Sequence, residues 1–342
     1  MQGGRERRAL DDNRINVAIC LDARMLDAAI VLAASIKAHA RAARPVRLYA
    51  LTDFTSPDLA EVAAKMNDET FELIPTPCTN VHGHFPIRDH ITAGTYLRFL
   101  LPELLPDVDK IIYLDVDIVV HRDLEALYDT PLEGHPLAAM PDWPMLVGTL
   151  TWPTFFIPYG KEKLRFAAYV KKVLGLECEG TTNYFNCGVM VFDLAYWRAH
   201  DIAGRTVAYL TAHPELYYMD QDALNYICGG KYARLDQRYN SFANCSFPAI
   251  VNVLVRFTKA GRRWEALRTV WRRDPWVIHY AGANKPWTPG DARTPRDALW
   301  WHYAAMSPMR DRILASYAAK ETAQQRRRSK VPAALRSAAG AT

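Results

Sequence analysis

The sequence predicts an α/β fold built on a mainly parallel, doubly wound sheet. Short apolar runs without polar alternation recur along the chain, and such runs are typical of strands buried on both faces of a parallel sheet. Helical segments separate these runs, an alternation that favours parallel strands joined by crossover helices. Half of the 342 residues are hydrophobic, which is enough to fill the core of one large domain with additions.

In the first part of the chain, strands and helices alternate regularly. Strands are predicted at residues 17–21, 46–52, 71–74 and 111–114. The Ala-rich stretch 25–40 is helical in character, and a further helix begins where Ser56 can cap it, with Pro57 at its first position. A loop rich in Pro, Gly and His covers about 75–95, and a helix is predicted at 95–101.

The second part of the chain is less regular. An aromatic-rich irregular segment is predicted at 141–160, strands at 188–193 and 276–279, and helices at 220–228 and 296–320. We therefore divide the chain into a polar N-terminal segment (1–14), a main domain (15–290) and a helical C-terminal extension with a basic tail (291–342).

The composition disfavours several classes of protein. No window approaches the roughly 20 apolar residues of a membrane span, and the polar start lacks the apolar centre of a secretion signal. The six cysteines are scattered and form no Cys-x-x-Cys pair, so a zinc knuckle or redox dithiol is not expected. Several lie in apolar stretches, as reduced core cysteines of cytosolic proteins do.

The tail contributes much of the net charge of +5, through Arg326, Arg327, Arg328 and Lys330. Few apolar residues anchor it, so one interpretation is a disordered, solvated tail. The other is peripheral contact with an anionic surface, such as a membrane leaflet or an acidic lipid-linked substrate. No base-stacking motif accompanies the charge, and nucleic acid is not expected as a partner.

The strand at 111–114 (IIYL) is followed at once by Asp115 and Asp117. On an extended chain, residues two apart point to the same side, so we expect both carboxylates to converge on one object at the strand end. Close carboxylates repel each other, and a divalent cation keeps both ionised. Asp-x-Asp also occurs in solvated turns and in phosphatases of the haloacid dehalogenase type, where the first Asp is a nucleophile.

The segment WVIHYAGANKPW (276–287) carries a further candidate ligand. His279 follows a short strand and precedes a Gly-containing turn, which lets backbone approach a ligand closely. A lone His in this position is also often a hydrogen-bonded structural residue. Lys285 follows at a place where its ammonium can meet a phosphate. With two carboxylates and diphosphate oxygens, an imidazole completes a cation site that suits Mn²⁺ better than Mg²⁺, the alternative ion.

Other polar residues have both a structural and a functional interpretation. Asp220 is either a helix N-cap or a ligand contact, and Asp222 favours the helix dipole. Asn186, beside a Gly at a strand entry, is a turn residue or a donor to a polar ligand. Arg98 is a surface cation or a clamp on an anion.

Taken together, the motifs resemble glycosyltransferase family 8, the retaining enzymes that include glycogenin and bacterial lipopolysaccharide galactosyl- and glucosyltransferases. The resemblance is greatest to the bacterial lipooligosaccharide α-galactosyltransferases. It is carried by HITAGTYLR (90–98), YLDVD (113–117), YFNCGV (184–189), DQDALN (220–225) and HYAGANKPW (279–287), which are specific only in this order. It implies a single Rossmann-like nucleotide-sugar-binding catalytic domain of the GT-A type over residues 15–290.

The resemblance also implies roles for individual residues. Asp115 and Asp117 match the metal-binding acids, and His279 matches the third protein ligand. Asp22 matches the acid that meets the uracil base, and Gly282 and Lys285 match the contacts to the diphosphate. The residues that line the nucleotide and sugar are matched by His90, Ile91, Thr95, Arg98 and Val116. Positions around the transferred hexose are matched by Asp142, Asn186, Asp220 and Gln221. The pattern departs at Arg24, where relatives carry an Asn near the ribose.

The reaction implied is transfer of galactose or glucose from a UDP-sugar to a hydroxyl of a saccharide, with retention of the anomeric configuration. In this reaction, Mn²⁺ and Lys285 are expected to assist the departure of UDP. The expected acceptor is a lipopolysaccharide core or another lipid-linked oligosaccharide. Asp220 and Gln221 are the candidate catalytic groups beside the hexose, but a neutral amide is a poor nucleophile, which favours front-face attack.

The alternatives are a metal-dependent phosphatase of the haloacid dehalogenase type and a non-catalytic UDP-sugar binder. The first is disfavoured because strand–helix units precede the acids, and the second because the matched ligand positions are filled. We expect a cytoplasmic enzyme with peripheral contact at the inner face of the membrane.

Overall fold

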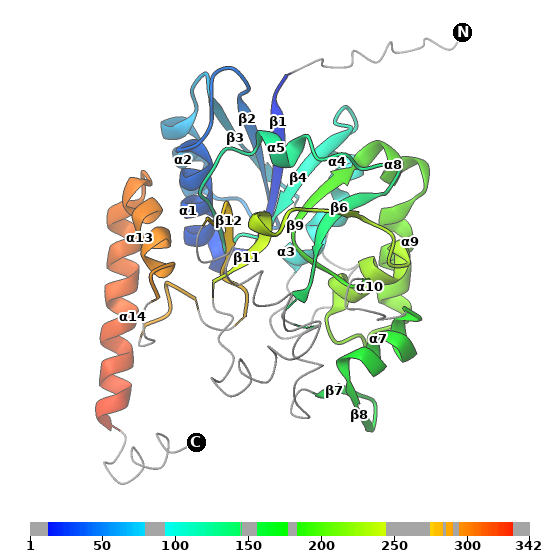
Figure 1. Cartoon of the computed structure of the whole chain (residues 1–342). Helices are drawn as coiled ribbons and strands as arrows, with labels where there is room; N and C mark the ends of the chain where they lie inside the picture. The colour runs from blue at the N-terminus through cyan, green and yellow to red at the C-terminus, as the bar shows by residue number, and fades with distance from the viewer. Residues whose placement is uncertain are drawn as a thin grey trace.

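A mixed seven-stranded sheet forms the centre of the computed structural model, which describes residues 13–78, 93–143, 145, 156–176, 183–243, 274–282, 285–289 and 294–330 (Figure 1). Its strands are β1 (Ile15–Leu21), β2 (Val46–Thr52), β3 (Phe71–Pro77), β4 (Lys110–Leu114), β6 (Leu137–Pro141), β9 (Phe185–Asp193) and β10 (Ala233–Arg234). Their order is β10-β6-β9-β4-β1-β2-β3, and only β9 runs antiparallel to its neighbours. The predicted mixed, mainly parallel α/β fold is therefore confirmed.

Helices cover both faces of this sheet, as the apolar strands require. They include α1 (Leu26–Lys37), α2 (Pro57–Met66), α7 (Phe166–Leu174), α8 (Leu194–Ala199), α9 (Ile202–Ala212) and α10 (Met219–Cys228). Along β1, Val17 and Ile19 pack in the core that α1 and α2 share, whereas Ala18 and Cys20 pack in the core of α7 to α10. Ser56 caps α2 as predicted, since its hydroxyl accepts the Leu59 N–H at 3.1 Å.

The order of the strands reverses beside β1. The chain leaves β1 through β2 to β3 and then returns to β4 on the other side of β1. In open α/β sheets, ligands bind outside the carboxyl ends of the strands at such a reversal. Asp22 follows β1 and Asp115 follows β4, so both acids lie at this edge, which points downward in Figure 1. Because β9 runs the opposite way, its first residues lie at the same edge.

A small second sheet completes this edge. It consists of β11 (Ser241–Phe242), β12 (Val277–His279) and β5 (Ile118–Val120), in that order. The antiparallel pairing of β12 with β5 sets His279 opposite Ile118, the residue that follows Asp117. The parallel pairing of β11 with β12 sets Phe242 beside His279.

The C-terminal extension forms two helices, α13 (Asp297–Met306) and α14 (Arg310–Lys330), where the sequence predicted one at 296–320. The break falls at Ser307, whose backbone is extended, because Pro308 disfavours a helical residue before it and cannot donate an N–H. Trp300 and Tyr303 of α13 belong to the core of α1. From α14, Arg312 pairs with Asp27 at 2.6 Å and also with Asp58.

Other local predictions differ from the structure. The helix predicted at 95–101 is three short pieces, α3 (Ala93–Tyr96), the 3₁₀-helix η2 (Leu97–Leu100) and α4 (Leu101–Leu104), since Pro102 fits only the first turn of a new helix. Within the segment predicted to be irregular, β6 ends at Pro141 and β7 (Phe156–Tyr159) pairs with β8 (Glu162–Arg165).

Cys20, Cys78, Cys187 and Cys228 are buried and form no disulfide. Among the described helices, none combines the length and apolarity needed to cross a bilayer.

Candidate active site

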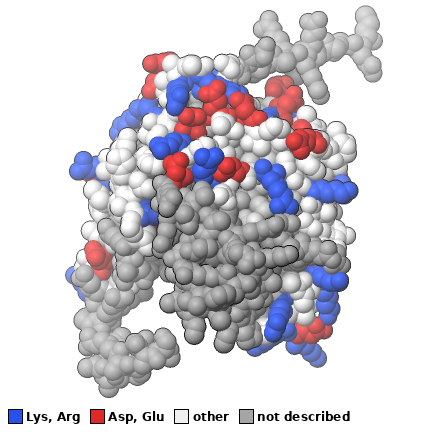
Figure 2. Space-filling view, in the orientation of Figure 1, with Lys and Arg blue, Asp and Glu red and all other residues white. Residues whose placement is uncertain are grey.

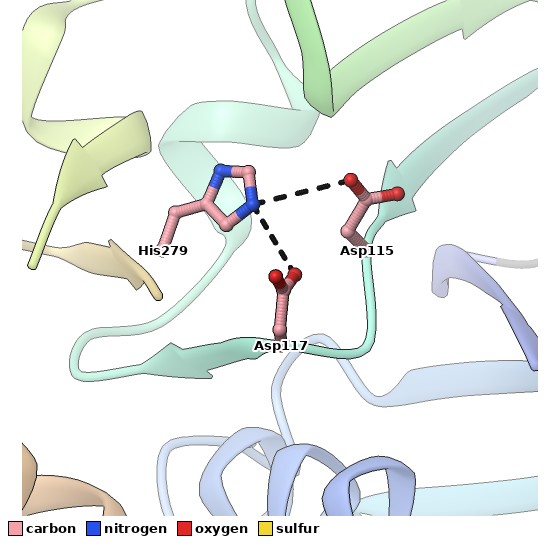
Figure 3. Close-up of side chains that lie close together, drawn as sticks. All are labelled: Asp115, Asp117 and His279. Atoms are coloured by element: carbon pink, nitrogen blue, oxygen red, sulfur yellow. Dashed lines mark ion pairs between the residues drawn. The ribbon is translucent and has the colours of Figure 1, made fainter. Parts of the chain in front are cut away.

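Two carboxylates and an imidazole meet at the carboxyl edge of the sheet. His279 Nε2 lies 3.2 Å from Asp117 Oδ1 and 4.0 Å from Asp115 Oδ2, so one ring nitrogen faces both acids (Figure 3). The ligand atoms of the three residues all lie within 4.8 Å of one another. The structure thus brings together the three residues that the sequence predicted as metal ligands.

The backbone that positions these acids is not the extended chain that we assumed. Residues 115–117 leave β4 and turn into β5, so the same-side rule for extended residues does not apply to them. Asp115 is held in place because its N–H donates to the carbonyl of Gly188 at 2.8 Å. Asp117 is held because its carbonyl accepts the Tyr280 N–H at 2.8 Å, directly after His279 on β12. The carboxylates converge because two different strands fix the two ends of the turn.

Each carboxylate uses one oxygen for the protein and turns the other toward His279. Oδ1 of Asp115 accepts the Tyr113 hydroxyl at 2.9 Å and Arg98 Nη2 at 3.2 Å, while Oδ2 faces the imidazole. Oδ2 of Asp117 accepts Lys285 Nζ at 2.5 Å, while Oδ1 faces the imidazole. Two oxygens and one nitrogen are therefore presented to a common centre.

The electrostatics of the site keep Asp117 ionised. Burial alone would raise the pKa of Asp117, but the adjacent His279 and Lys285 bring that pKa below its ordinary value. Burial alone would lower the pKa of Arg98, yet Tyr113, Asp220 and Asp115 raise it, so its charge persists although the side chain is only 4% exposed.

The donor set fits a divalent cation. Metal–ligand bonds of about 2.1 Å separate adjacent ligands of an octahedral ion by about 3.0 Å and opposite ligands by about 4.2 Å. The spacings of 3.2 and 4.0 Å from His279 Nε2 lie within this range. Carboxylate oxygens combined with an imidazole nitrogen suit Mn²⁺ better than Mg²⁺, which prefers oxygen alone.

A second polar cluster lies beside the acids and contains the residues predicted to surround a hexose. Gln221 Oε1 accepts the Cys187 N–H at 3.1 Å and Asn186 Nδ2 at 3.3 Å. Gln221 Nε2 donates to Asp142 Oδ2 at 3.1 Å and to the Tyr184 hydroxyl at 3.2 Å. Since a backbone N–H can only donate, Cys187 fixes which end of the Gln221 amide is oxygen. Burial raises the pKa of Asp142, against the hydrogen bonds from Asn186 and Gln221.

Arg98 connects the two clusters. Its Nη1 pairs with Asp220 Oδ2 at 3.2 Å, and its Nη2 donates to Asp115 on the metal side. The guanidinium also stacks over the Tyr113 ring, 4.4 Å from the ring centroid. Burial raises the pKa of Asp220, although Arg98 opposes this rise. Of the two interpretations of Arg98, the structure therefore supports a clamp on carboxylates.

Of the remaining predicted site residues, the structure describes some and leaves others outside the described residues. Asp22 caps a 3₁₀ turn through Oδ1 and pairs with Arg24 at 3.0 Å through Oδ2. Gly282 has φ +87°, a conformation that favours glycine in the turn between His279 and Lys285. The predictions for His90 and Ile91, and for the side chain of Thr95, fall outside the described residues. Val116 lies in the turn and is 8% exposed.

Sequence reasoning missed the roles of two residues that hold the site. Asp222 is fully buried and accepts the hydroxyls of Tyr169 at 2.6 Å and Tyr184 at 2.7 Å, so it supports Gln221 through Tyr184. Asn240, also fully buried, contacts His279. Asp222 stood within a quoted motif, but Asn240 follows no strand or helix pattern that could have singled it out.

The whole span from β1 to the turn after His279 matches a known family. Residues 16–289 match the family model described as glycosyl transferase family 8. The chain belongs to glycosyltransferase family 8. Two similar family relatives are general stress protein A of Bacillus subtilis and lipopolysaccharide 1,3-galactosyltransferase of Salmonella typhimurium. The first is 26% identical over 76% of this chain and 82% of that protein, and the second 23% identical over 92% and 88%.

Solved structures show the same fold. A bifunctional glycosyltransferase, WbbM, superposes with a TM-score of 0.74 at 23% identity over 90% of this chain, which spans 52% of that protein. The galactosyltransferase LgtC, solved with donor and acceptor sugar analogs, superposes with a TM-score of 0.65 at 24% identity, over 86% of this chain and 96% of LgtC. These similarities agree with the predicted fold and with the predicted resemblance to bacterial lipopolysaccharide galactosyltransferases.

Proposed function

We propose that this member of family 8 transfers galactose or glucose from a UDP-sugar to a saccharide hydroxyl, with retention and with Mn²⁺. The observation that carries the proposal is the convergence of Asp115, Asp117 and His279 at the switch point of the sheet, with Lys285 beside them. Acids, imidazole and ammonium in this arrangement are suited to a cation and a diphosphate together.

On the leaving-group side, Asp115 Oδ2, Asp117 Oδ1 and His279 Nε2 would hold the cation. When bound, Mn²⁺ supplies Lewis-acid stabilisation of the charge that develops on the departing diphosphate. Lys285 Nζ is tethered by Asp117 and by the Tyr280 carbonyl at 2.7 Å, which keeps the ammonium at the edge of the cation site. Shifted from Asp117 to a phosphate oxygen, it adds a second positive charge to the leaving group.

On the hexose side, Gln221 and Asp220, the residues predicted to carry the chemistry, are both engaged in protein contacts. Both acceptor sites of Gln221 Oε1 are occupied by Cys187 and Asn186. Asp220 is paired with Arg98, which ties up a carboxylate oxygen. These contacts support front-face attack on an oxocarbenium-like centre, with Asp142, Asn186 and Asp220 binding sugar hydroxyls.

The acceptor that we propose is a lipid-linked oligosaccharide such as a lipopolysaccharide core, met by a cytoplasmic enzyme at the inner face of the membrane. Exposed cations in two segments support this. Arg326 lies near the end of α14, and Lys161, Lys163 and Arg165 lie on the β7–β8 hairpin. In Figure 1 both segments extend toward the end of the molecule where the site lies, and Figure 2 shows Lys and Arg gathered over β7 and β8. Anionic lipid would attract that end.

The test is a panel of UDP-sugars incubated with the protein and Mn²⁺, with release of UDP followed in the absence of any acceptor. We expect slow UDP release from UDP-galactose or UDP-glucose and its loss on chelation with EDTA. Phosphate release from p-nitrophenyl phosphate without UDP release would favour the phosphatase alternative. Binding of a UDP-sugar without turnover, even with saccharide acceptors present, would favour the non-catalytic binder.

A further inference from the structure

A chain of buried amides runs from the hexose side of the site to the imidazole. Asn186 Oδ1 accepts the Gly188 N–H at 2.9 Å and Asn240 Nδ2 at 2.9 Å. Asn240 Oδ1 lies 2.9 Å from His279 Nδ1. Asn240 is fully buried, and Asn186 and His279 are 9% and 3% exposed, so bulk water does not compete for these contacts.

The direction of every hydrogen bond in this series of amides follows from the backbone N–H of Gly188, with which the series begins. The Gly188 N–H can only donate, so the atom of Asn186 that receives it must be oxygen. Asn240 must then present its NH₂ to that oxygen, because two amide oxygens at 2.9 Å would repel each other. The remaining oxygen of Asn240 faces His279, so Nδ1 of the ring carries a proton. In a neutral imidazole, the lone pair then lies on Nε2, the nitrogen that faces Asp115 and Asp117.

The space around the ring supports the same assignment. Phe242 stacks on His279 with ring centroids 5.4 Å apart. A Cβ at position 188 would overlap ring atoms of His279 and lie 3.0 Å from Asn186 Oδ1, so the backbone of Gly188 also lies close to the ring. A flip of the ring would put a carbon in place of Nδ1 and lose the Asn240 contact.

We propose that Asn240 is a positioning residue, which holds the proton of His279 on Nδ1 and so leaves Nε2 free to bind a cation between Asp115 and Asp117. Asn186 connects this hydrogen-bonded series to the cluster of Asp142 and Gln221. The inference rests on the proposed metal-dependent function. A residue that accepts a hydrogen bond from the second nitrogen of a metal-bound imidazole orients the ring, and its removal typically weakens metal binding about 10–100-fold.

Two substitutions separate the contacts of Asn240. Asn240→Leu has a similar volume and neither donates nor accepts. Asn240→Asp still accepts the Nδ1 proton but cannot donate to Asn186 when ionised. Ser241→Ala is the matched control, because Ser241 is equally buried and its hydroxyl bonds the Gln237 carbonyl at 3.5 Å rather than the ring. Circular dichroism and thermal melts establish that each variant is folded.

Mn²⁺ affinity, measured by calorimetry with UDP present, is the first readout. We expect Asn240→Leu to bind Mn²⁺ about 10–100-fold more weakly, and Asn240→Asp and Ser241→Ala to remain within a few-fold of wild type. In Asn240→Asp, the KM for the UDP-sugar should rise while Mn²⁺ affinity holds, since an acid oxygen then faces Asn186 Oδ1. Unchanged Mn²⁺ affinity in folded Asn240→Leu, or an unchanged KM in Asn240→Asp, would overturn the corresponding half of the inference.

Ring ¹⁵N NMR of the metal-free wild type, at a pH where imidazoles are neutral, is the second readout. We expect His279 as the Nδ1–H tautomer in wild type and in Asn240→Asp, which answers the question even where Asn240→Leu does not fold. A wild-type His279 that carries its proton on Nε2 and none on Nδ1 would overturn the inference and leave the proposed function standing. Wild type that binds no Mn²⁺ with UDP would instead overturn the proposed metal dependence, and the inference with it.

Discussion

The ammonium of Lys285 lies 2.5 Å from Asp117 Oδ2, so a residue late in the chain neutralises an acid that precedes β5. The same ammonium donates to the Tyr280 carbonyl at 2.7 Å. The contacts hold this ammonium between the proposed metal ligands and the turn that contains Gly282. In the proposed reaction, a cation in this position would stabilise the charge of the departing diphosphate.

Lys285→Ala should therefore reduce kcat by about 100–1,000-fold, because it removes a positive charge from the leaving group. The affinity for UDP should change much less, since the uridine contacts remain. Steady-state kinetics with titration of UDP by calorimetry measure both quantities. A variant that altered only KM would show that Lys285 binds the ground state and does not assist departure.

Asp117→Asn should abolish most metal-dependent UDP release, with a loss of at least about 100-fold, because an amide oxygen is a weak substitute for a carboxylate ligand. The fold should persist, since Asp117 keeps its backbone bond with Tyr280. Activity, Mn²⁺ calorimetry and thermal melts are the measurements. Asp123→Asn, at a partly exposed acid that pairs with Arg41 away from His279, is the control and should retain activity. Near-normal turnover in Asp117→Asn would remove this residue from the ligand set.

Gly188→Ala should weaken both stability and Mn²⁺ binding, because its methyl group would overlap the His279 ring. Overpacking of this kind costs about 1–3 kcal/mol, which urea denaturation can resolve. Val191→Ala, in the same strand and fully buried, is a matched control that should lose stability through a cavity but keep its Mn²⁺ affinity. Equal Mn²⁺ affinities for the two variants would show that the ring tolerates a side chain at position 188.

Asp222→Asn should change how stability depends on pH. Burial raises the pKa of Asp222 from 3.8 to about 6, opposed by the hydroxyls of Tyr169 and Tyr184. The folded protein therefore holds this proton more tightly than the unfolded chain. The stability that this group contributes is full below about pH 3.8 and is lost as pH rises through about 6.

The difference in unfolding free energy between Asp222→Asn and wild type should accordingly shift in favour of the variant as pH rises across this interval. Urea titrations of both proteins at several pH values from 4 to 7 measure that difference. A difference that is independent of pH would show that Asp222 titrates normally in the folded protein.

Deletion of the chain after Gln325 should spare acceptor-free UDP release, because the side chains from Ala318 to Ala323 on α14 are already exposed. The same deletion should reduce co-sedimentation with vesicles that contain phosphatidylglycerol, and leave binding to neutral phosphatidylcholine vesicles unchanged. Loss of UDP release on deletion would assign the tail a structural role, and unchanged sedimentation would leave it no role at the membrane.

The strands and the pair of acids could be predicted because each left a local signal. Unbroken apolar runs marked β1, β2 and β4, and the acids followed β4 directly. His279 was linked to Asp115 and Asp117 by the chemistry of a mixed oxygen and nitrogen cation site and by the resemblance, since nothing in the spacing states that β12 pairs with β5. The argument from an extended Asp-x-Asp predicted that the two carboxylates converge, but it assumed a geometry that the turn at 115–117 does not have.

What could not be predicted depends on contacts between distant segments. Asn240 matters because Asn186 and His279 flank it, 54 and 39 positions away. Arg98 is a clamp rather than a surface cation because β4 and α10 place acids on both sides of it. The broken helices at 93–104 and 297–330 had a visible cause in Pro102 and Pro308, but a sequence pattern of helical period outweighed those prolines in our prediction.

Lys285 stands 168 positions after Asp117, and β12 reaches its partner β5 only when that stretch has been made. During synthesis on the ribosome, the acids emerge long before the imidazole and the ammonium that complete their site. A nascent or prematurely terminated product thus carries Asp115 and Asp117 without the other residues of the proposed cation site. The proposed activity would therefore be acquired late, when β12 pairs with β5.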